Sequence, residues 1–557
     1  MSTISRRTLL LGLGGAGSAA ALAACTTTGP NTPGATGAPT PGRAFGTGPA
    51  VTPTRGQRVV EKVLTPKVST VDLGGPVVST WTYDDSVPGP LIRANAGDLI
   101  RVRLDNQLPA ETTVHWHGIR LANAADGVPG LTQDPVQRGA GYTYAFTAPD
   151  PGTYFYHPHV GVQLDRGLYA PLIVDDPAEP GTYDAEWVLV LDDWIDGTGR
   201  TPEQVLADLK SGTGMTGMTG MTGMTGMTGM TGMSGTTGMT GMSGMSGMSG
   251  MSGMDQGSTG SMGSMGGTAT GTPSGSMGGS MGGSMGGMQM GPEPFGDAGD
   301  VTYPHYLVNG RVPTAPTQLR ARPGQRVRLR IINAAADTIF TVALGGHDLT
   351  ITHSDGFAVQ PTRTRALHLG MGERYDAVVT VKDGVFPFVA VPFGKTGQAM
   401  AVLRTSPNGT PPAATVRPDQ LTGPALIGSQ LQPAESARLA ARQPDVTAPV
   451  ALTGQMSPYA WGINGAPYGR NDPVLVRHGQ RVRLNLVNQT MMAHPYHVHG
   501  HTFAVAGSGL RKDTVLLRPM QSLPIEIDAD NVGSWMTHCH NIYHAEAGMM
   551  LELRYQQ

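Results

Sequence analysis

Charge is scarce in this chain of 557 residues: 14% are Asp, Glu, Lys or Arg, and the formal net charge is -3. A balance so close to neutral gives no reason to expect nucleic acid or acidic membranes as partners. Long amphipathic helical patterns are also scarce, whereas 80 glycines and 44 prolines punctuate short strand-like runs such as DLIRVRLDN. These features together predict an all-β chain built mainly from antiparallel sheets.

One segment with almost no charged residues lowers the charged fraction of the chain. Residues 212–290 consist mostly of Gly, Ser, Thr and Met, and twenty of the thirty methionines lie between Met215 and Met290. This stretch has no histidine, no cysteine and one charged residue, Asp255. Because such a composition cannot bury enough surface to fold, we expect a disordered insertion. Its thioethers are soft donors that prefer Cu(I), so the insertion could gather copper; a tolerated low-complexity expansion is the alternative.

Cysteine is almost absent, with Cys25 and Cys539 the two in the chain. Residues 1–25 have the form of a twin-arginine export signal, in which Arg6 and Arg7 precede an apolar stretch. This stretch ends in LAAC, which resembles a bacterial lipobox and predicts a lipid on Cys25. The expected location is the outer face of the cytoplasmic membrane, the periplasm or the cell envelope. An ordinary signal peptide with an incidental cysteine is the alternative.

A flexible tether is expected over residues 26–55, which are rich in Thr, Pro and Gly. If Cys25 carries lipid, no disulfide can form, and Cys539 needs another role.

A repeated segment divides the rest of the chain. AGDLIRVRLDN, PGQRVRLRIIN and HGQRVRLNLVN end at Asn106, Asn333 and Asn488, and each has a glycine nine residues before the asparagine. The apolar residues between them alternate as in a half-buried strand. The glycines are 227 and 155 residues apart, and the methionine-rich insertion explains the longer gap. We therefore predict domains at 56–178, 179–410 and 441–557, with a linker at 411–440 and the insertion inside the middle domain.

The outer repeats each carry two His-x-His pairs. The pairs are His115 and His117, His157 and His159, His497 and His499, and His538 and His540. The middle repeat has apolar residues at the corresponding positions, which are Val342, Leu344, Val389 and Val391. Residues i and i+2 of a strand share a face, so each pair presents two imidazoles together. Eight clustered imidazoles would be costly to bury without partners for their nitrogens, which predicts a metal site.

The kind of metal depends on Cys539, which lies between two of these histidines in HCHNIYHAEAGMM. Its sulfur is expected on the opposite face of the strand from their imidazoles. The same segment supplies His544 and Met549, and HPYHVHGH supplies His494. Two His, one Cys and a weak axial Met form the ligand set of a blue-copper site. A closed structural zinc site, the alternative, would leave the other eight histidines without a role.

HWHG, HPH, HPYHVHGH and HCHNIYHAEAGM together resemble the four copper-binding motifs of the multicopper oxidases, in the same order. The resemblance spans residues 55–557 apart from the insertion. It implies three cupredoxin-like Greek-key β-sandwich domains. It also implies four copper ions, one of type 1, one of type 2 and two of type 3, with the trinuclear cluster between the first and third domains.

The resemblance assigns ligands by motif position. The type 1 copper would take His494, Cys539, His544 and Met549, and the type 2 copper His115 and His497. One type 3 copper would take His117, His157 and His540, and the other His159, His499 and His538. Asp126 resembles the acid that relatives hold near the cluster for proton supply, although its ADG setting is also good turn chemistry. Glu546 is a candidate acid beside the type 1 histidine.

These ligands imply an enzyme that couples one-electron oxidation of a substrate to the four-electron reduction of dioxygen to water. Methionine-rich insertions resemble those of bacterial copper-efflux oxidases, so we expect Cu(I) as the donor, phenols as side substrates and a role in copper tolerance. Such relatives have an acidic residue four positions before the type 1 histidine, where this chain has Thr490. A laccase-type phenol oxidase and a Mn(II) or Fe(II) oxidase are alternatives, as is a copper-binding lipoprotein without turnover.

Overall fold

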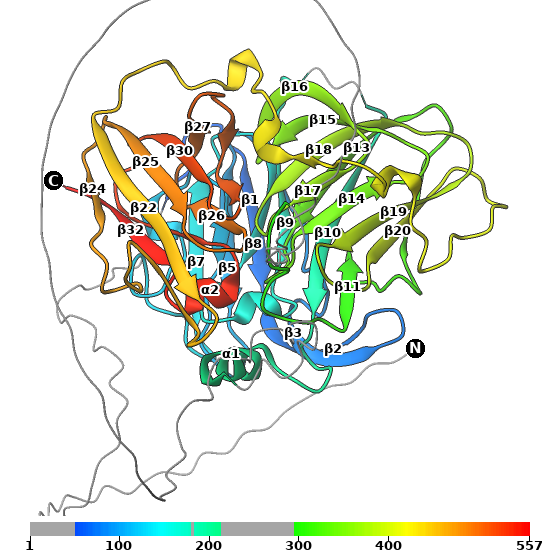
Figure 1. Ribbon diagram of the computed structural model, residues 1–557, viewed down its shortest axis with the longest axis horizontal. Coiled ribbons are helices and arrows are strands. Elements are labelled where there is room, and N and C mark those ends of the chain that lie inside the picture. Colours follow the sequence, from blue (N-terminus) through cyan, green and yellow to red (C-terminus); the bar gives the residue numbers. More distant parts are fainter. Residues whose placement is uncertain (1–50, 180–182, 213–293, 557) are drawn as a thin grey trace, which may run out of the picture. The chain divides into compact units, whose positions relative to one another are not determined.

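The computed structural model of the protein describes residues 51–179, 183–212 and 294–556. The predicted export signal with Cys25, most of the tether and nearly all of the methionine-rich segment lie outside the described residues. Strands dominate the described ranges, which confirms the all-β prediction (Figure 1). No helix in these ranges is long and apolar enough to cross a membrane.

The first repeat contains strands β1 to β9 in sheets ordered β1-β5-β7, β2-β3 and β4-β9-β8-β6. Their bounds are β1 (Val59–Leu64), β2 (Pro66–Asp72), β3 (Val77–Tyr83), β4 (Ile92–Asn95), β5 (Leu99–Asp105), β6 (His115–His117), β7 (Gly141–Thr147), β8 (Gly152–His157) and β9 (Ala170–Asp175). Short 3-10 turns η1 (Asn123–Ala125) and η2 (Gln163–Asp165) follow two of the histidine motifs.

The middle repeat pairs its strands into sheets ordered β11-β10-β13-β18-β15-β16 and β12-β20-β19-β14-β17-β21. Their bounds are β10 (Ala185–Trp194), β11 (His305–Val308), β12 (Thr317–Arg320), β13 (Arg326–Asn333), β14 (Phe340–Leu344), β15 (Leu349–Ser354), β16 (Phe357–Thr364), β17 (Leu367–Leu369), β18 (Arg374–Thr380), β19 (Val385–Pro392), β20 (Ala399–Arg404) and β21 (Leu426–Ile427). The helix α1 (Pro202–Ser211) follows β10, and turns η4 (Asp419–Leu421), η5 (Gly428–Gln430) and η6 (Glu435–Ala437) lead toward the third repeat.

The third repeat has sheets ordered β23-β22-β25-β30-β27-β28 and β24-β32-β31-β26-β29. Their bounds are β22 (Val446–Gln455), β23 (Ala460–Ile463), β24 (Val474–Val476), β25 (Arg481–Asn488), β26 (His494–Val498), β27 (Phe503–Val505), β28 (Arg511–Lys512), β29 (Thr514–Leu517), β30 (Ser522–Asp528), β31 (Ser534–Cys539) and β32 (Met550–Tyr555). The short helix α2 (Ile542–Glu546) joins β31 to β32.

The repeated segment has the same place in all three repeats. It forms β5, β13 and β25, and each of these strands has one parallel neighbour (β1, β10, β22) and one antiparallel neighbour (β7, β18, β30). The closing asparagine is buried in each copy, and its amide donates to loop carbonyls, for example from Asn106 to Val136 at 2.8 Å. Its side-chain oxygen accepts the backbone N–H two residues later. The asparagine therefore fixes the loop that leads into the histidine motif.

The two motif segments of each outer repeat lie on neighbouring strands. In the first repeat β6 pairs with β8, so that His115 lies opposite His157. In the third repeat β26 pairs with β31, so that His497 lies opposite His538. The equivalent strands of the middle repeat, β14 and β19, pair in the same way but carry apolar side chains that are mostly buried.

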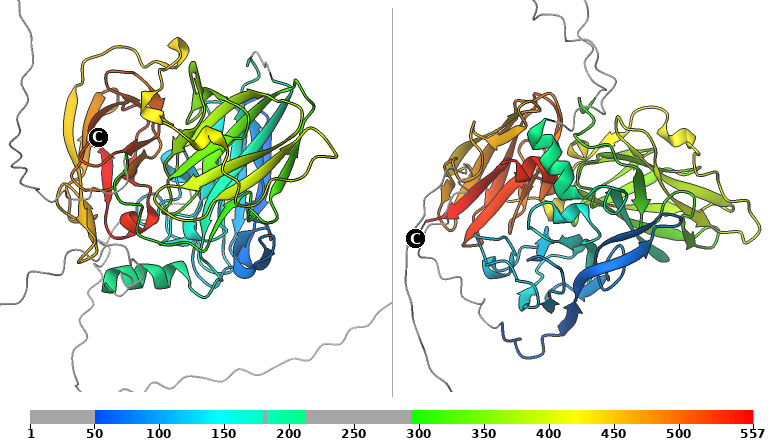
Figure 2. Two further views of the ribbon diagram at one scale, coloured as in Figure 1. Left: turned by 45° about the vertical axis from the view of Figure 1, so that its right-hand side comes forward. Right: turned by 90° about the horizontal axis from the view of Figure 1, so that it is seen from below.

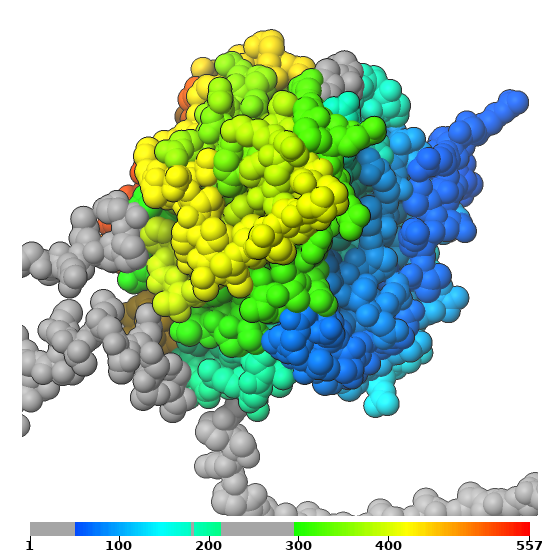
Figure 3. Space-filling view, turned by 90° about the vertical axis from the view of Figure 1, so that its right-hand side faces the viewer, coloured from blue at the N-terminus to red at the C-terminus, as the bar shows by residue number. Residues whose placement is uncertain are grey.

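The middle repeat packs directly against the first. Figure 3 shows residues of the middle repeat, in green and yellow, beside those of the first repeat, in blue. Leu73 and Val78 of the β2–β3 hairpin share a buried cluster with Leu307 and Val312, and the Val312 N–H donates to the Leu73 carbonyl at 2.8 Å. The helix α1 lies beside α2 of the third repeat in both views of Figure 2. The Lys210 ammonium of α1 donates to the Glu546 carbonyl of α2 at 3.4 Å.

Candidate metal centre

Eight buried imidazoles from the first and third repeats converge, and they are the eight predicted from the sequence: His115, His117, His157, His159, His497, His499, His538 and His540. The two repeats meet ring against ring. His115 stacks on His499 with ring centroids 3.8 Å apart, and His117 stacks on His497 at the same separation. The cluster thus requires both outer repeats, and neither contains it alone.

Four of these eight imidazoles have one nitrogen held by the protein and one without a hydrogen-bond partner in the described part of the chain. Nδ1 of His115, His157 and His497 lies 2.9 Å from a backbone carbonyl, while Nε2 of each has no such partner. His117 has the reverse arrangement, with Nε2 near Thr514 at 3.1 Å and Nδ1 free. Buried nitrogens are normally satisfied, so this pattern leaves lone pairs that a metal would use.

The charge state of the cluster also suits metal binding. Burial and the neighbouring imidazoles lower the pKa of His157, His159, His499 and His540 well below the ordinary range, and lower that of His538 to about 3. The rings are therefore neutral near pH 7, the form that ligates metal. Nε2 of His499 and Nε2 of His538 are 3.0 Å apart. Two neutral nitrogens at this distance can share a proton or face a common ion.

A second group of donors lies on the other side of β31. Nδ1 of His494 and Nδ1 of His544 are 3.1 Å apart, and the Cys539 sulfur lies 3.5 Å and 3.7 Å from them. All three residues are fully buried. Met549 is buried beside them, and its backbone carbonyl accepts the Cys539 N–H at 3.1 Å. Two imidazoles, a thiolate and a thioether form a set that suits copper.

Several sets of ligand atoms come within 4.8 Å of one another. His494, Cys539 and His544 form one set, and His159, His499 and His538 form another. Both agree in membership with ligand groups that the resemblance implies. His115 joins His497 and His499 in one set and His117 and His157 in another, while the ring of His540 lies 4.8 Å from that of His117. The structure brings the predicted ligands together; their division among copper types stays a prediction.

Asp126 lies within the histidine cluster. It is fully buried just after η1, where its carboxylate lies 3.0 Å from Nδ1 of His499 and 3.2 Å from Nδ1 of His115. One carboxylate therefore contacts an imidazole from each outer repeat. Asp126 therefore ends the 3-10 turn η1, and it also contacts the histidine cluster.

Glu546, the candidate acid beside His544, is not the residue whose carboxylate bonds to that imidazole. No hydrogen bond joins its carboxylate to His544 within the described ranges, and Asp300 takes that place, with its oxygen 2.9 Å from Nε2 of His544. Burial alone would lower the pKa of His544, but the ion pair with Asp300 raises it to about 10. Asp300 therefore holds Nε2 of His544, while Nδ1 of the same ring lies 3.7 Å from the Cys539 sulfur. Sequence reasoning missed Asp300 because 244 residues separate it from His544.

A β-sandwich that holds a Cys-His-His set beside a cluster of eight histidines defines a copper oxidase. Profiles described as multicopper oxidase match residues 66–179, 287–408 and 441–557. The chain is 43% identical to the multicopper oxidase MmcO of Mycobacterium tuberculosis, over 99% of this chain and 97% of that protein. The chain belongs to the multicopper oxidase family, and it is an oxidoreductase that uses oxygen and copper.

Other relatives agree with this assignment. A copper resistance protein A homolog of Pseudomonas syringae pv. tomato is 27% identical, over 87% of this chain and 91% of its own length. The crystal structure of a laccase from Botrytis aclada has a TM-score of 0.65 and 22% identity, and it covers 90% of this chain and 88% of the laccase. At that identity the likeness shows the fold alone, which confirms the predicted cupredoxin architecture.

Proposed function

We propose that this protein is a cuprous oxidase of the cell envelope that couples oxidation of Cu(I) to the reduction of dioxygen to water. The observation that carries the choice of donor is the way His544 is covered. Its imidazole is fully buried, and the carboxylate of Asp300 caps its outer nitrogen. A bulky phenol has no direct access to this imidazole, whereas a small cation needs less room, and Oδ1 of Asp300 has no hydrogen-bond partner among the described residues.

The residues fit four copper ions with the ligands that the resemblance implies, because the free nitrogens of the cluster and the donors around Cys539 are buried and aimed at common space. Bound copper would supply one-electron redox chemistry at Cys539 and dioxygen reduction at the histidine cluster. The chain joins the two sites covalently. Cys539 faces His494 and His544, while its neighbours His538 and His540 belong to the cluster on the other face of the strand.

The two ends of the methionine-rich segment support Cu(I) as the donor. Its first described flank, α1, contacts α2 through Lys210, close to His544. Its second flank pairs with the segment before His494, where the Ala493 N–H donates to the Phe295 carbonyl at 3.0 Å, and Asp300 follows. Twenty methionines are thus inserted between two anchors beside the Cys539 donors. Exposed Met491, on the segment that the second flank contacts, adds a further soft donor.

The names of relatives favour the same donor. Copper resistance proteins from Pseudomonas syringae and Escherichia coli align with 87% of this chain. Laccases of Cryptococcus neoformans align as well, at 24–25% identity. A cuprous oxidase with side activity on phenols is compatible with both groups.

Oxygen uptake with Cu(I), Fe(II), Mn(II) and a bulky dimethoxyphenol tests the proposal. We expect Cu(I) to be the best donor at low concentration. Replacing the methionines between Met215 and Met290 by serine should lower Cu(I) turnover at limiting copper several-fold and leave phenol oxidation unchanged. The serine version keeps the length of the segment and its low charge, and it removes the thioethers.

Three results would contradict the proposal. Equal loss of both activities in the serine version, or no loss at all, would remove the copper-specific role of the segment. Cys539→Ser should abolish oxygen uptake with every donor, since the sulfur is the shared route between the two sites. Oxygen uptake that survived in this variant would refute the assignment of Cys539.

A further inference from the structure

The middle repeat, although it has no histidines at the motif positions, forms part of the wall of the histidine cluster. The loop before β18 approaches two imidazoles so closely that a Cβ on Gly372 would lie 3.0 Å from ring atoms of both His117 and His540. Gly372 also has φ of +83°, a conformation that favours glycine. The next residue but one, Arg374, begins β18 and is fully buried.

Arg374 connects all three repeats. Its guanidinium donates to both carboxylate oxygens of Asp513 in the third repeat, each at 2.6 Å. Nε donates to the Thr153 carbonyl of the first repeat at 3.0 Å, on the strand that leads to His157. The ion pair of Arg374 and Asp513 lies against the HWHG motif. A Cβ on Gly118, the glycine of this motif, would lie 2.4 Å from the Arg374 guanidinium and 2.6 Å from the Asp513 carboxylate. A glycine at this position therefore leaves room for the ion pair.

Asp513 also contacts two imidazoles of the histidine cluster. Its carboxylate lies 3.3 Å from Nε2 of His117 and 3.5 Å from Nδ1 of His497, and its backbone carbonyl lies 2.9 Å from that same Nδ1. These two imidazoles come from different repeats and stack at 3.8 Å. Their opposite nitrogens, Nδ1 of His117 and Nε2 of His497, are the ones left free.

From these contacts we infer that Arg374 and Asp513 form a positioning pair for the trinuclear centre, in which the middle repeat fixes the ring orientation of His117 and His497. The inference rests on the proposed function. Asp513 aims the free nitrogen of each ring inward, and Arg374 keeps the carboxylate in place by a two-point bond. Without Arg374 the carboxylate would be a buried charge that lacks its closest cation, so it would turn away from the imidazoles.

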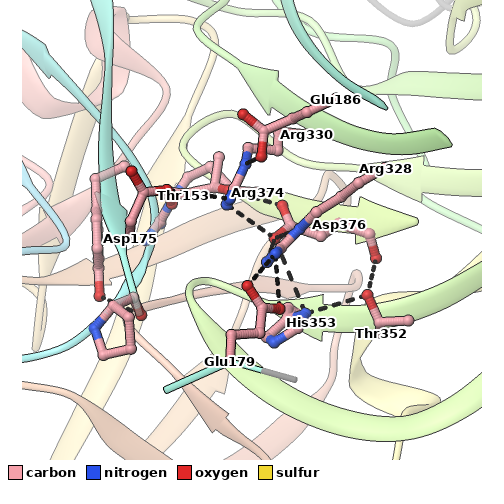
Figure 4. Close-up of polar contacts among 12 residues, drawn as sticks. Thr153, Asp175, Glu179, Glu186, Arg328, Arg330, Thr352, His353, Arg374 and Asp376 are labelled. Atoms are coloured by element: carbon pink, nitrogen blue, oxygen red, sulfur yellow. Dashed lines mark hydrogen bonds and ion pairs between the residues drawn. The ribbon is translucent and has the colours of Figure 1, made fainter. Parts of the chain in front are cut away.

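A second arginine–aspartate pair at the same boundary offers a matched control. Arg328 donates to Asp376 at 2.6 Å and 3.1 Å, and both residues are buried near Thr153. Figure 4 shows Arg328 and Arg330 pointing toward Asp376, with Arg374 close by. The hydrogen bonds of Arg328 are with Asp376 and Glu179, and its guanidinium lies over the Tyr183 ring. None of these contacts reaches an imidazole of the cluster in the described part of the chain.

The experiment compares Arg374→Lys, Asp513→Asn and Arg328→Lys with the wild type by copper stoichiometry, by the blue absorption of thiolate-bound copper and by the paramagnetic resonance signal of type 2 copper. Both Arg374→Lys and Asp513→Asn should retain the blue absorption, which reports a folded third repeat. We expect each to bind type 2 copper about 10- to 100-fold more weakly against a chelator. Arg328→Lys should bind it as the wild type does.

An equal loss of type 2 copper in Arg328→Lys would overturn the inference, because the effect would then be general loosening of the boundary. Unchanged type 2 copper in Asp513→Asn would also overturn it, whatever the result for Arg374→Lys. The wild type separates this inference from the proposed function: a wild-type protein with thiolate-bound copper and no type 2 signal would refute the trinuclear centre itself.

Discussion

At the scale of single residues, Asp126 is a buried acid that contacts the histidine cluster from both outer repeats. Its carboxylate contacts His499, from the third repeat, and its backbone carbonyl contacts His115, from the first. Its other carboxylate oxygen, Oδ1, lies 3.2 Å from Nδ1 of His115 but makes no hydrogen bond among the described residues. Proton supply to the cluster, the role that the resemblance implies for Asp126, stays a prediction.

Asp126→Asn tests this role. The amide keeps the size of the side chain and can contact His499, but it cannot carry a proton. We expect reoxidation of the reduced enzyme by dioxygen to slow by about 100-fold or more, because a positioned proton donor contributes that much. Reduction of the Cys539 site by substrate should not change, and stopped-flow measurement of the two half-reactions distinguishes them. Equal slowing of both halves would show that the variant is merely misfolded.

At the scale of elements, α2 is a short helix whose position depends on its cap. The Asn541 side chain accepts the N–H groups of Tyr543 and His544 at 3.1 Å and 3.4 Å, and its amide donates to Asp337 of the middle repeat. A helix of five residues has little stability of its own, so the cap and the packing decide where His544 lies.

Asn541→Ala should therefore destabilise the fold by about 1–2 kcal/mol and loosen His544. We expect a lower melting temperature together with a weakened blue absorption of thiolate-bound copper. Asn541→Ser retains an oxygen that can cap the helix, so it should recover most of the absorption. A melting temperature that falls without any change in absorption would show that the cap does not position His544.

The face on which each strand side chain lies could be predicted, because it depends on the spacing of residues close together in the sequence. The i and i+2 spacing of each His-x-His pair placed the imidazoles on one face, and β31 has Cys539 facing His494 and His544 while His538 contacts His499. The repeated Gly and Asn positions predicted equivalent strands, and β5, β13 and β25 have equivalent neighbours. In these cases a residue's side of the strand follows from its position in the sequence alone.

Contacts between repeats could not be predicted in this way. Asp300 reaches His544 across 244 residues, and Arg374 reaches Asp513 across 139. Both ion pairs depend on how the three β-sandwiches pack against one another, and no periodic pattern in the sequence predicts that packing. Glu546 is a candidate because it is near His544 in the chain, yet the carboxylate that bonds to the imidazole comes from another repeat.

At the scale of the whole molecule, buried charge links the middle repeat to the first. Arg328 and Arg330 both contact Asp376, and Asp376 accepts the Thr153 hydroxyl of β8 at 2.7 Å (Figure 4). Burial alone would raise the pKa of Asp376, but the two arginines lower it to about 2. A carboxylate whose pKa falls on folding stabilises the folded state above its ordinary pKa, and this contribution disappears as the pH falls toward 2.

Asp376→Asn should therefore lower the stability of the copper-free protein at pH 7 by about 3 kcal/mol, since it leaves two buried arginines with one partner fewer. The asparagine resembles the protonated acid, so the difference in melting temperature between variant and wild type should shrink between about pH 4 and pH 2. Asp348→Asn is the control: its pair with Arg363 is largely exposed, and exposed pairs contribute little. Calorimetry across this pH range measures both variants. A difference that stays constant from pH 7 to pH 2 would mean that Asp376 contributes by shape and hydrogen bonding, and that its charge does not hold the first and middle repeats together.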